Sequence, residues 1–296
     1  MAGCRVYEML NKSARVATAR SARARSAPSP ARGSREGPGS AERILRVLEA
    51  YHPTDSDLSL SEISTRTGMT KSSVHRALAT LTTHGFIEQD LATRRYRLGI
   101  RLFEIGSGAI HQRGLHGVAY PALVELTRET GETGHLAVMS GTEAVYVYKI
   151  EGTSNFSMSS RVGGRCPTYC TGIGKVLLAW SGDGLFNRVV KEGLRSYTRS
   201  TITSAGRLRA ELESVRNRGY AVDDMEYHEG LRCIAAPIRD HAGAVIAAIG
   251  IAGSSHSLKD ARFQSLIPQV VRAGITVSRG LGYVDIGRLP RVAVKC

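Results

Sequence analysis

The stretch SLSEISTRTGMTKSSVHRALATLTTHGFIEQDLATRRYRLG, residues 59–99, predicts two helices that follow each other closely. Ser59 and Glu62 have the spacing of a capping box, in which a hydroxyl and a carboxylate each satisfy an amide at the start of a helix. Gly68 is placed to end this short helix, because glycine readily adopts the left-handed conformation that closes helices. Thr70 is placed to cap a longer second helix. The spacing therefore predicts a helix-turn-helix.

The residues on either side extend this prediction to a winged helix-turn-helix over residues 40–99. Residues 86–89 and 95–98 alternate between apolar and polar side chains across a short polar segment, which indicates a β-hairpin. Before the two helices, Ser40 is expected to cap a further helix, which Pro53 stops.

The longer helix has an apolar and a polar face. At 100° per residue its apolar side chains gather on one side and are expected to be core, namely Val74, Ala77, Leu78 and Leu81. On the opposite face Arg76 is suited to phosphate or guanine, and the free amides at the helix start favour a phosphate. We therefore predict DNA-binding residues in this helix and at the hairpin tip, namely Thr70, Lys71, Ser72, Ser73, His75, Arg76, Arg94 and Arg95. The alternative is a solvated basic face on a small helical unit.

The charge of the whole chain favours a polyanionic partner. The 296 residues include 40 Lys and Arg against 26 Asp and Glu, a net charge of +14 at pH 7. Nucleic acid or an anionic membrane surface would suit such a balance. The longest uncharged apolar stretch, residues 242–253, is too short and too rich in glycine to span a bilayer. With the predicted helix-turn-helix, the basic charge favours DNA, and no membrane partner is predicted. Five widely spread cysteines form no disulfide framework, which fits a reducing cytoplasm, where the protein would meet the nucleoid through DNA.

The two ends of the chain are predicted to be tails. Residues 1–39 hold eight Lys and Arg against two acids and consist largely of Ala, Ser, Arg, Gly and Pro. Such a segment buries too little apolar surface to offset its chain entropy, so we expect a disordered basic tail. A transit peptide, or a start codon assigned too early, would give the same composition. Residues 285–296 are expected to be a C-terminal tail.

Between the winged unit and the C-terminal tail the pattern predicts a linker helix, residues 100–114, and an α+β domain, residues 115–284. Further helices are expected at residues 118–130, 175–180, 205–218 and 258–281. Strands are expected at residues 136–139, 144–150, 156–161, 233–239 and 245–251.

Three stretches together resemble the IclR family of bacterial transcription regulators. The most specific is GYAVDDMEYHEGLRCIAAPI, residues 219–238, which is similar to that family's signature throughout. The second is TGIGKVLLA, residues 171–179, and the third joins LSEI at residues 60–63 with TKSSVHRAL at residues 70–78. The resemblance extends from residue 40 to about residue 283.

The resemblance implies a fold and a function. The fold would be a winged helix-turn-helix, a linker helix that helps dimerisation, and a C-terminal GAF-like α/β domain that binds a small organic effector. Members of the family are homodimers or dimers of dimers on palindromic double-stranded operator DNA. They repress or activate operons, often for the catabolism of carboxylic or aromatic acids. A protein of this kind is not an enzyme and uses no cofactor.

The resemblance also implies an effector site, formed by Met158, Gly172, Ile173, Asp223, Leu231, Cys233 and Gly250. Gly172 lets backbone come close to a ligand, and Lys175 opens a helix whose N-terminus favours an anion. A relative has a serine where this chain has Gly250, and the loss of that hydroxyl predicts more room and a larger or more apolar acid. Asp223 could instead order its loop, and Met158 and Cys233 could be plain core residues.

Two other functions are compatible with parts of the sequence. Cys166, Cys170 and Cys233 on a GAF-like domain could perform thiol redox chemistry if their pKa were lowered. Alternatively, the basic tail would suit a constitutive architectural DNA-binding protein with an inert C-terminal half. The Cys-x3-Cys spacing of Cys166 and Cys170 has no second pair or histidine cluster beside it, so no metal site is predicted.

Overall fold

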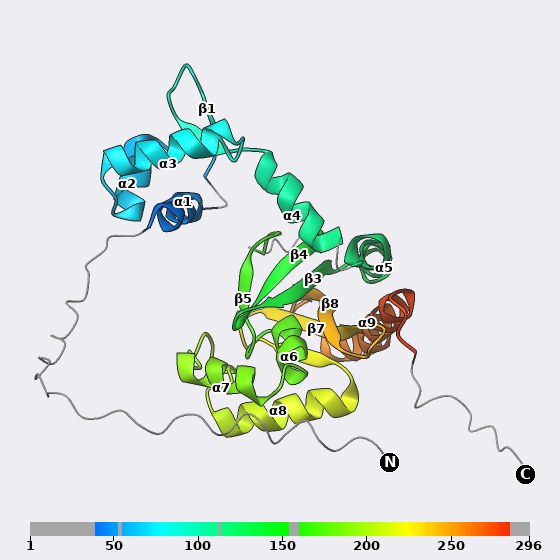
Figure 1. The fold of residues 1–296 in the computed structure, drawn as a ribbon. Coiled ribbons are helices and arrows are strands. Elements are labelled where there is room, and N and C mark those ends of the chain that lie inside the picture. Colours follow the sequence, from blue (N-terminus) through cyan, green and yellow to red (C-terminus); the bar gives the residue numbers. More distant parts are fainter. Residues whose placement is uncertain (1–38, 53–54, 112–113, 154–159, 285–296) are drawn as a thin grey trace, which may run out of the picture. The chain divides into compact units, whose positions relative to one another are not determined.

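The structure is a computed structural model that describes residues 39–52, 55–111, 114–153 and 160–284, with only the backbone described at residues 109–111. Met158 and nearly all of both predicted tails lie outside these residues. The chain divides into two compact units between Leu98 and Gly99 (Figure 1). No described helix combines the length and the apolar composition that crossing a bilayer requires.

The first unit is the predicted winged helix-turn-helix. Its elements are α1 (Ser40–Glu49), α2 (Leu60–Thr67), α3 (Lys71–Thr83), β1 (Ile87–Gln89) and β2 (Tyr96–Leu98). Ser59 and Glu62 form the predicted capping box, and Gly68 ends α2 with a φ of 68°. The expectation that Ser40 caps α1 is wrong, because Ser40 is the first helical residue and Gly39 precedes it without a side-chain cap.

The core of this unit confirms the predicted apolar face of α3. Val74, Ala77, Leu78 and Leu81 are all buried. They pack with Val47 of α1 and Ile63 of α2, and with Ile87 and Tyr96 of the hairpin. A bridge between Leu58 and Tyr96 ties the hairpin to the chain just before α2. The polar face of α3 is left exposed.

The second unit contains α4 (Arg101–His111) and an α+β domain built around an antiparallel sheet. Its helices are α5 (Leu115–Thr130), α6 (Gly172–Ala179), α7 (Asp183–Glu192), α8 (Ala205–Arg218) and α9 (Asp260–Gly280). Its strands are β3 (Thr133–Ser140), β4 (Glu143–Ile150), β5 (Arg165–Pro167), β6 (Ala221–Asp224), β7 (Leu231–Arg239) and β8 (Val245–Ser254). The strand order in the sheet is β5-β4-β3-β8-β7-β6.

Two edge strands and one helix differ from the pattern predicted. Most of the strand expected at residues 156–161 lies outside the described residues, and Ser160 and Arg161 are not in a strand. The edge strand is instead β5, whose Pro167 is tolerated because an edge strand can leave a backbone position without a donor. The sequence pattern missed β6, which is short and ends in two acids, and the helix α7.

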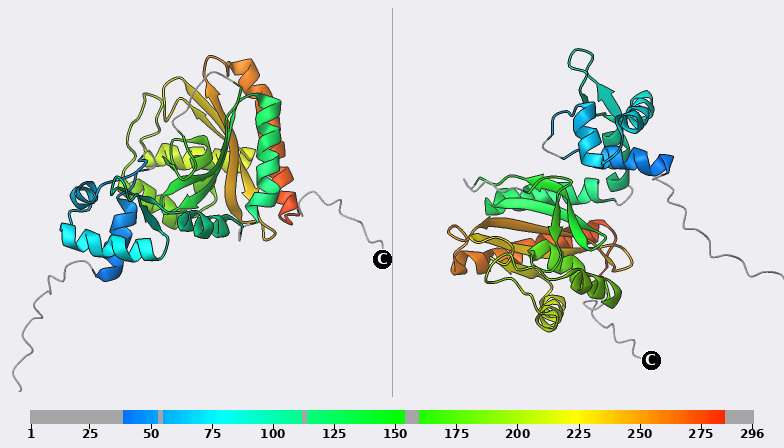
Figure 2. Two further views of the ribbon diagram at one scale, coloured as in Figure 1. Left: turned by 90° about the horizontal axis from the view of Figure 1, so that it is seen from above. Right: turned by 90° about the vertical axis from the view of Figure 1, so that its left-hand side faces the viewer.

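The two faces of the sheet carry side chains of different size. Large aliphatic residues such as Ile234 and Ile249 face α5 and α9. The opposite face carries small residues, including Ala137, Ala235 and Ala248, and packs against α6, α7 and α8. Figure 2 shows these two helical layers on either side of the sheet. Because alanine occupies little volume, α6 can approach the strands closely, and this places its N-terminus against the middle of the sheet.

Candidate functional site

Helix α3 presents the predicted DNA-binding residues to solvent. Lys71, Ser72, His75 and Arg76 are exposed, and Ser73 is half-buried. The hydroxyl of Thr70 caps the helix by accepting from the amide of Ser73 at 3.4 Å. Within the described part of the chain, no carboxylate lies within ion-pair distance of Lys71 or Arg76. Both cations are therefore available to a polyanion.

The two predicted arginines of the hairpin tip differ in their exposure and in their ion pairs. Arg95 is half-buried and pairs with Asp57 at 2.5 Å and with Glu62 at 2.9 Å, so it ties the hairpin to the start of α2. Arg94 has an exposed side chain and a left-handed backbone with a φ of 59°, and no ion pair to another described residue. Arg97, on the adjacent strand, pairs with Glu88 at 2.7 Å. Arg94 is thus the better placed of the two predicted arginines to contact a partner.

The second candidate site is a cavity of about 470 Å³ in the α+β domain. Six of the seven residues predicted to bind an effector line it, namely Gly172, Ile173, Asp223, Leu231, Cys233 and Gly250. Lining residues that the sequence did not indicate include His135, Tyr146, Ser160, Arg161, Arg165, Cys166, Thr171, Tyr227 and His228. They come from strands and turns far apart in the chain, and no local pattern marks which side of a strand faces the cavity.

The start of α6 supplies backbone donors to the cavity wall. Thr171 caps the helix by accepting from the amide of Gly174 at 3.1 Å. The amides of Gly172 and Ile173 belong to the first turn, whose N–H groups have no acceptor within a helix. A Cβ on Gly172 would lie 3.4 Å from the Cβ of Cys233, so glycine brings the helix start close to β7.

Asp223 is the buried acid of this wall and lies opposite Cys233 in the register of β6 and β7. Asp223 is only 1% exposed to solvent. Oδ1 accepts from the amide of Glu226 at 2.7 Å, and Oδ2 has no hydrogen-bond partner among the described residues. Burial raises the pKa of Asp223 to about 7, and the nearby charge of Glu226 acts in the same direction.

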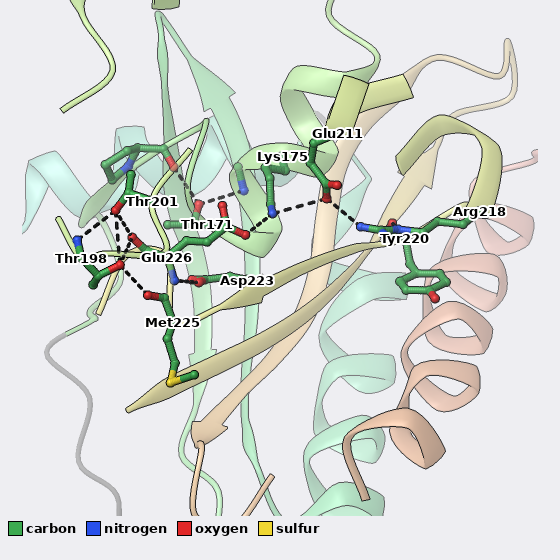
Figure 3. A network of polar contacts seen from close by, with 12 residues as sticks. Thr171, Lys175, Thr198, Thr201, Glu211, Arg218, Tyr220, Asp223, Met225 and Glu226 are labelled. Carbon is green, nitrogen blue, oxygen red and sulfur yellow. Dashed lines mark hydrogen bonds and ion pairs between the residues drawn. The ribbon is translucent and has the colours of Figure 1, made fainter. Parts of the chain in front are cut away.

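An ion-pair network lies behind this wall (Figure 3). Lys175 is 1% exposed; its Nζ pairs with Glu226 and lies 3.4 Å from Oε1 of Glu211. Glu211 also pairs with Arg218 at 2.8 Å. Lys175 was expected to open a helix whose N-terminus favours an anion, but the helix begins at Gly172. Lys175 is therefore its fourth residue, and it does not line the cavity.

Two threonines hold the backbone beside this network. Thr198 donates to the carbonyl oxygen of Met225 at 2.7 Å, and Thr201 donates to that of Glu226 at 2.6 Å. Met225 has a left-handed backbone with a φ of 60°, which is unusual for a residue with a side chain. The loop after β6 is therefore held on both sides, by its carbonyls and by the carboxylate of Glu226.

His135 of β3 forms another part of the cavity wall. Its Nε2 lies 2.8 Å from the hydroxyl of Ser160, whose carbonyl oxygen accepts from Lys149 at 2.8 Å. Burial, with the charge of Lys149, lowers the pKa of His135 to about 3, so the imidazole is neutral at pH 7. These contacts hold Ser160, and the next residue, Arg161, lines the cavity with no ion pair to another described residue.

The room expected beside Gly250 is not present. A Cβ on Gly250 would lie 2.4 Å from the carbonyl oxygen of Ile234 and 3.0 Å from the Cα of Ala235. Glycine at this position therefore allows β7 and β8 to approach, and it adds no space for a larger acid. The lining includes histidine, tyrosine, serine, aspartate and arginine side chains. These polar groups do not favour the more apolar acid that was expected.

The cysteines of this region are not set up as nucleophiles. Burial raises the pKa of Cys166, Cys170 and Cys233, which disfavours the reactive thiolate. Across the described residues, no group of three or more His, Cys, Asp or Glu side chains is arranged to hold a metal ion.

The raised pKa of Asp223 predicts how stability depends on pH. The folded protein binds the proton of Asp223 more tightly than the unfolded chain does. Protonation of Asp223 therefore stabilises the folded state fully below about pH 4, and this contribution is lost as the pH rises to about 7. Above pH 7 the ionised group should cost on the order of 4 kcal/mol. Asp223→Asn stays neutral and should gain stability relative to the wild type between pH 5 and pH 8 in chemical denaturation. Asp183→Asn, at an exposed residue, is the control. The prediction would be contradicted if the free energy of unfolding of Asp223→Asn differed from that of the wild type by the same amount at pH 5 and at pH 8.

The buried ion pair predicts a non-additive double mutant. Lys175→Met leaves Glu226 buried without its cation, which should lower the free energy of unfolding by about 3–5 kcal/mol. Lys175→Met/Glu226→Gln should recover part of this loss, because no uncompensated charge remains. Arg209→Met breaks an exposed pair with Asp183 and should cost less than about 1 kcal/mol. If the double mutant lost as much free energy of unfolding as the two single mutants lose together, the two residues would not be coupled.

Comparison with known proteins assigns both units to one family. Residues 40–91 match the family model for the IclR helix-turn-helix domain, and residues 107–279 match that for the bacterial transcriptional regulator IclR C-terminal domain. The HTH-type transcriptional regulator XynR of Escherichia coli (strain K12) is 37% identical over 246 residues, which are 82% of this chain and 97% of XynR.

Two solved structures share the fold along most of the chain. The IclR protein of Thermotoga maritima is 32% identical with a TM-score of 0.68, covering 82% of this chain and 98% of that one. An IclR homolog from Microbacterium hydrocarbonoxydans, complexed with 4-hydroxybenzoate, is 26% identical with a TM-score of 0.75. The match covers 82% of this chain and 99% of that one. From the matched domains and these relatives, this chain belongs to the IclR family of DNA-binding transcriptional regulators.

Proposed function

We propose that this protein is a ligand-responsive regulator that senses a small organic acid and controls an operon, of a catabolic pathway, in the bacterial cytoplasm. The observation that carries the proposal is the cavity, which is lined both by Gly172 and Ile173 at the start of α6 and by the buried acid Asp223. Its volume of about 470 Å³ lies within the range of small-molecule sites. The amides at a helix start favour an anion, as an organic acid would supply.

A relative supports the choice of an organic acid. The homolog from Microbacterium hydrocarbonoxydans is complexed with 4-hydroxybenzoate, which is a small carboxylic acid. The polar lining of the present cavity, including Arg161 and Tyr227, is suited to a ligand that carries polar groups besides its carboxylate.

The proposed DNA contacts come from α3 and the hairpin tip. The N-terminus of a recognition helix usually enters the major groove, and this would bring Ser72 and Arg76 to the base edges and Lys71 to a phosphate. Arg94 would reach the backbone from the tip. Arg95, which was included in the predicted set, would act through the hairpin that its ion pairs hold.

The proposed switch requires two copies of the chain. Helix α4 leaves apolar side chains exposed, including Phe103 at 70% and Ile105 at 53%, which supports pairing of this linker helix in a homodimer or a dimer of dimers. An acid with different affinities for two dimer arrangements would shift the separation of the DNA-binding units. Half-sites of the operator would then lie about one helical turn, or a multiple of it, apart.

Neither rival function is favoured. The raised pKa of the buried cysteines opposes thiol redox catalysis. An architectural DNA-binding protein would bind DNA without sequence preference and with a steep salt dependence, and it would have no use for a cavity in the α+β domain.

The DNA-binding proposal predicts a specific role for Arg76. Arg76→Ala should weaken operator binding by about 1–3 kcal/mol and relax the preference at one base pair, because a guanine contact is lost. Fluorescence anisotropy on the operator and its single-base variants measures both effects. Arg209→Ala removes the same charge from an exposed residue of α8 and should leave affinity unchanged. Equal weakening on every DNA sequence would instead identify Arg76 as a phosphate contact.

The effector proposal predicts which substitution blocks the cavity. A panel of keto acids, hydroxy acids, benzoates and phenylpropanoids should contain an acid that raises the melting temperature and changes operator affinity. At a hundred times its Kd, such an acid stabilises the protein by about 2.7 kcal/mol. Gly172→Val should abolish both effects, because its side chain would fill the space beside Cys233.

Gly184→Val is the matched control, because a side chain there meets open space near the start of α7. It should leave the response to the acid intact. A response that survives in Gly172→Val would show that the acid acts elsewhere.

A further inference from the structure

We propose that Leu91 inserts between base pairs in the minor groove of the operator and bends the DNA. Leu91 belongs to the hairpin tip, residues 90–95, which joins β1 to β2. The inference rests on the proposed contact of this tip with DNA. It goes beyond that contact, because it assigns a deformation of the duplex to a side chain without charge.

Leu91 has a high exposure for a leucine. At 80% it is the most exposed of the large apolar side chains that the structure describes. Figure 1 shows the hairpin tip projecting beyond the helices of its own unit. A single exposed leucine is ordinary on a protein surface, so the structure of the tip around Leu91 decides what this side chain can do.

The hairpin tip is an ordered turn. Oδ1 of Asp90 accepts from the amide of Ala92 at 2.7 Å and from that of Thr93 at 3.0 Å. The carbonyl oxygen of Asp90 accepts from the amide of Arg94 at 2.8 Å. These hydrogen bonds fix the backbone on both sides of Leu91 without any contact to a hydrophobic core. Because the turn is already ordered, it loses little further entropy when it binds a partner.

The side chains of the hairpin tip suit the minor groove. The walls of this groove are sugars, which present apolar surface, and phosphates line its edges. Leu91 offers an apolar side chain to the groove. Arg94, three residues further on, offers an exposed cation with no ion pair to another described residue. Arg94 would bind a phosphate at the edge of the groove, while Leu91 reaches the bases.

The fold holds the hairpin tip beside the recognition helix. The hairpin shares a core with α3, in which Ile87 and Tyr96 pack with Leu78. The ion pairs of Arg95 also tie the tip to the chain around the start of α2. When α3 lies in the major groove, the next groove along the duplex is a minor groove. The tip would therefore meet that groove as a rigid part of the same unit.

Insertion gives an apolar residue at this place a function. Proteins that bend DNA from the minor groove insert leucine or a similar side chain between two base pairs, which unstacks them and kinks the duplex. Pyrimidine–purine steps such as TA unstack most readily. Leu91 would therefore favour such a step at a position that no hydrogen bond reads, and the deformation would add to the specificity of the operator.

The test measures the bend in a duplex that the protein itself selects. A short duplex, selected by the wild-type protein from a random-sequence library, carries a donor dye and an acceptor dye at its two ends. The wild-type protein should bend it by about 20–90°, measured by energy transfer between the dyes. Leu91→Ala should lose most of this bend, and Leu91→Met, which is also an apolar wedge, should keep it. Leu45→Ala is the matched control, because it removes a leucine that is 56% exposed on α1, and it should leave the bend unchanged.

A second measurement locates the unstacked step. 2-Aminopurine fluoresces more strongly when it is unstacked, and it replaces one adenine at a time on each side of the bases that α3 reads. The wild-type protein should raise the fluorescence at one such position in each half-site, and Leu91→Ala should not. Replacing the pyrimidine–purine step at that position by AA should weaken binding of the wild type by about tenfold and binding of Leu91→Ala by less than about threefold.

Four results would overturn the inference. They are a straight duplex bound by the wild type, equal bends with the wild type and Leu91→Ala, an equal loss of bend in Leu45→Ala, and no unstacked position in the fluorescence measurement. If Leu91→Ala keeps the bend but changes the oligomeric state of the free protein in sedimentation, Leu91 contacts a second copy of the chain and the inference is wrong.

The failure of this inference can be told apart from a failure of the proposed DNA contacts. If Arg76→Ala relaxes the preference at one base pair as predicted but the duplex stays straight, the proposed contacts stand and this inference alone fails. If the library yields no selected sequence, the proposed sequence-specific contacts fail, and the inference fails with them.

Discussion

The ion pair between Lys175 and Glu226 is the constraint on which the ligand-binding half of this protein depends. Both groups are buried, and a charge removed from water is tolerated only when its partner is in place. The pair joins α6 to the loop after β6, and the amide of Glu226 then orients Asp223. The ion pair between Lys175 and Glu226 therefore positions both the start of α6 and Asp223, although Asp223 and the first residues of α6 take no part in it.

The size of the side chains on the sheet allows this arrangement. Large aliphatic residues on one face form a stable core with α5 and α9. Alanines at positions such as 235 and 248 on the other face let α6 lie close to the strands. Gly250 serves the same purpose between strands, because β7 approaches too closely for any side chain. One face thus provides stability, and the other brings polar groups within reach of a small ligand.

The DNA-binding unit separates cations that hold the fold from cations that remain available. Arg95 and Arg97 are neutralised by acids of the same unit. Arg76 and Arg94 are exposed and unpaired within the described residues. An arginine already paired must give up its partner before it binds a phosphate, so the unpaired ones are the better candidates for contact. Counting basic residues along the sequence does not make this distinction.

The sequence by itself determined the features that depend on near neighbours. The capping box of Ser59 and Glu62 and the buried face of α3 follow from spacings of three and four residues. The signature at residues 219–238 identified the family, and through it six residues that line the cavity. Only the tertiary structure decided the contacts between distant segments, because local spacing carries no information about them. They include the pairing of Lys175 with a residue 51 positions away, the partners of Arg95, and the place of His135 at the cavity.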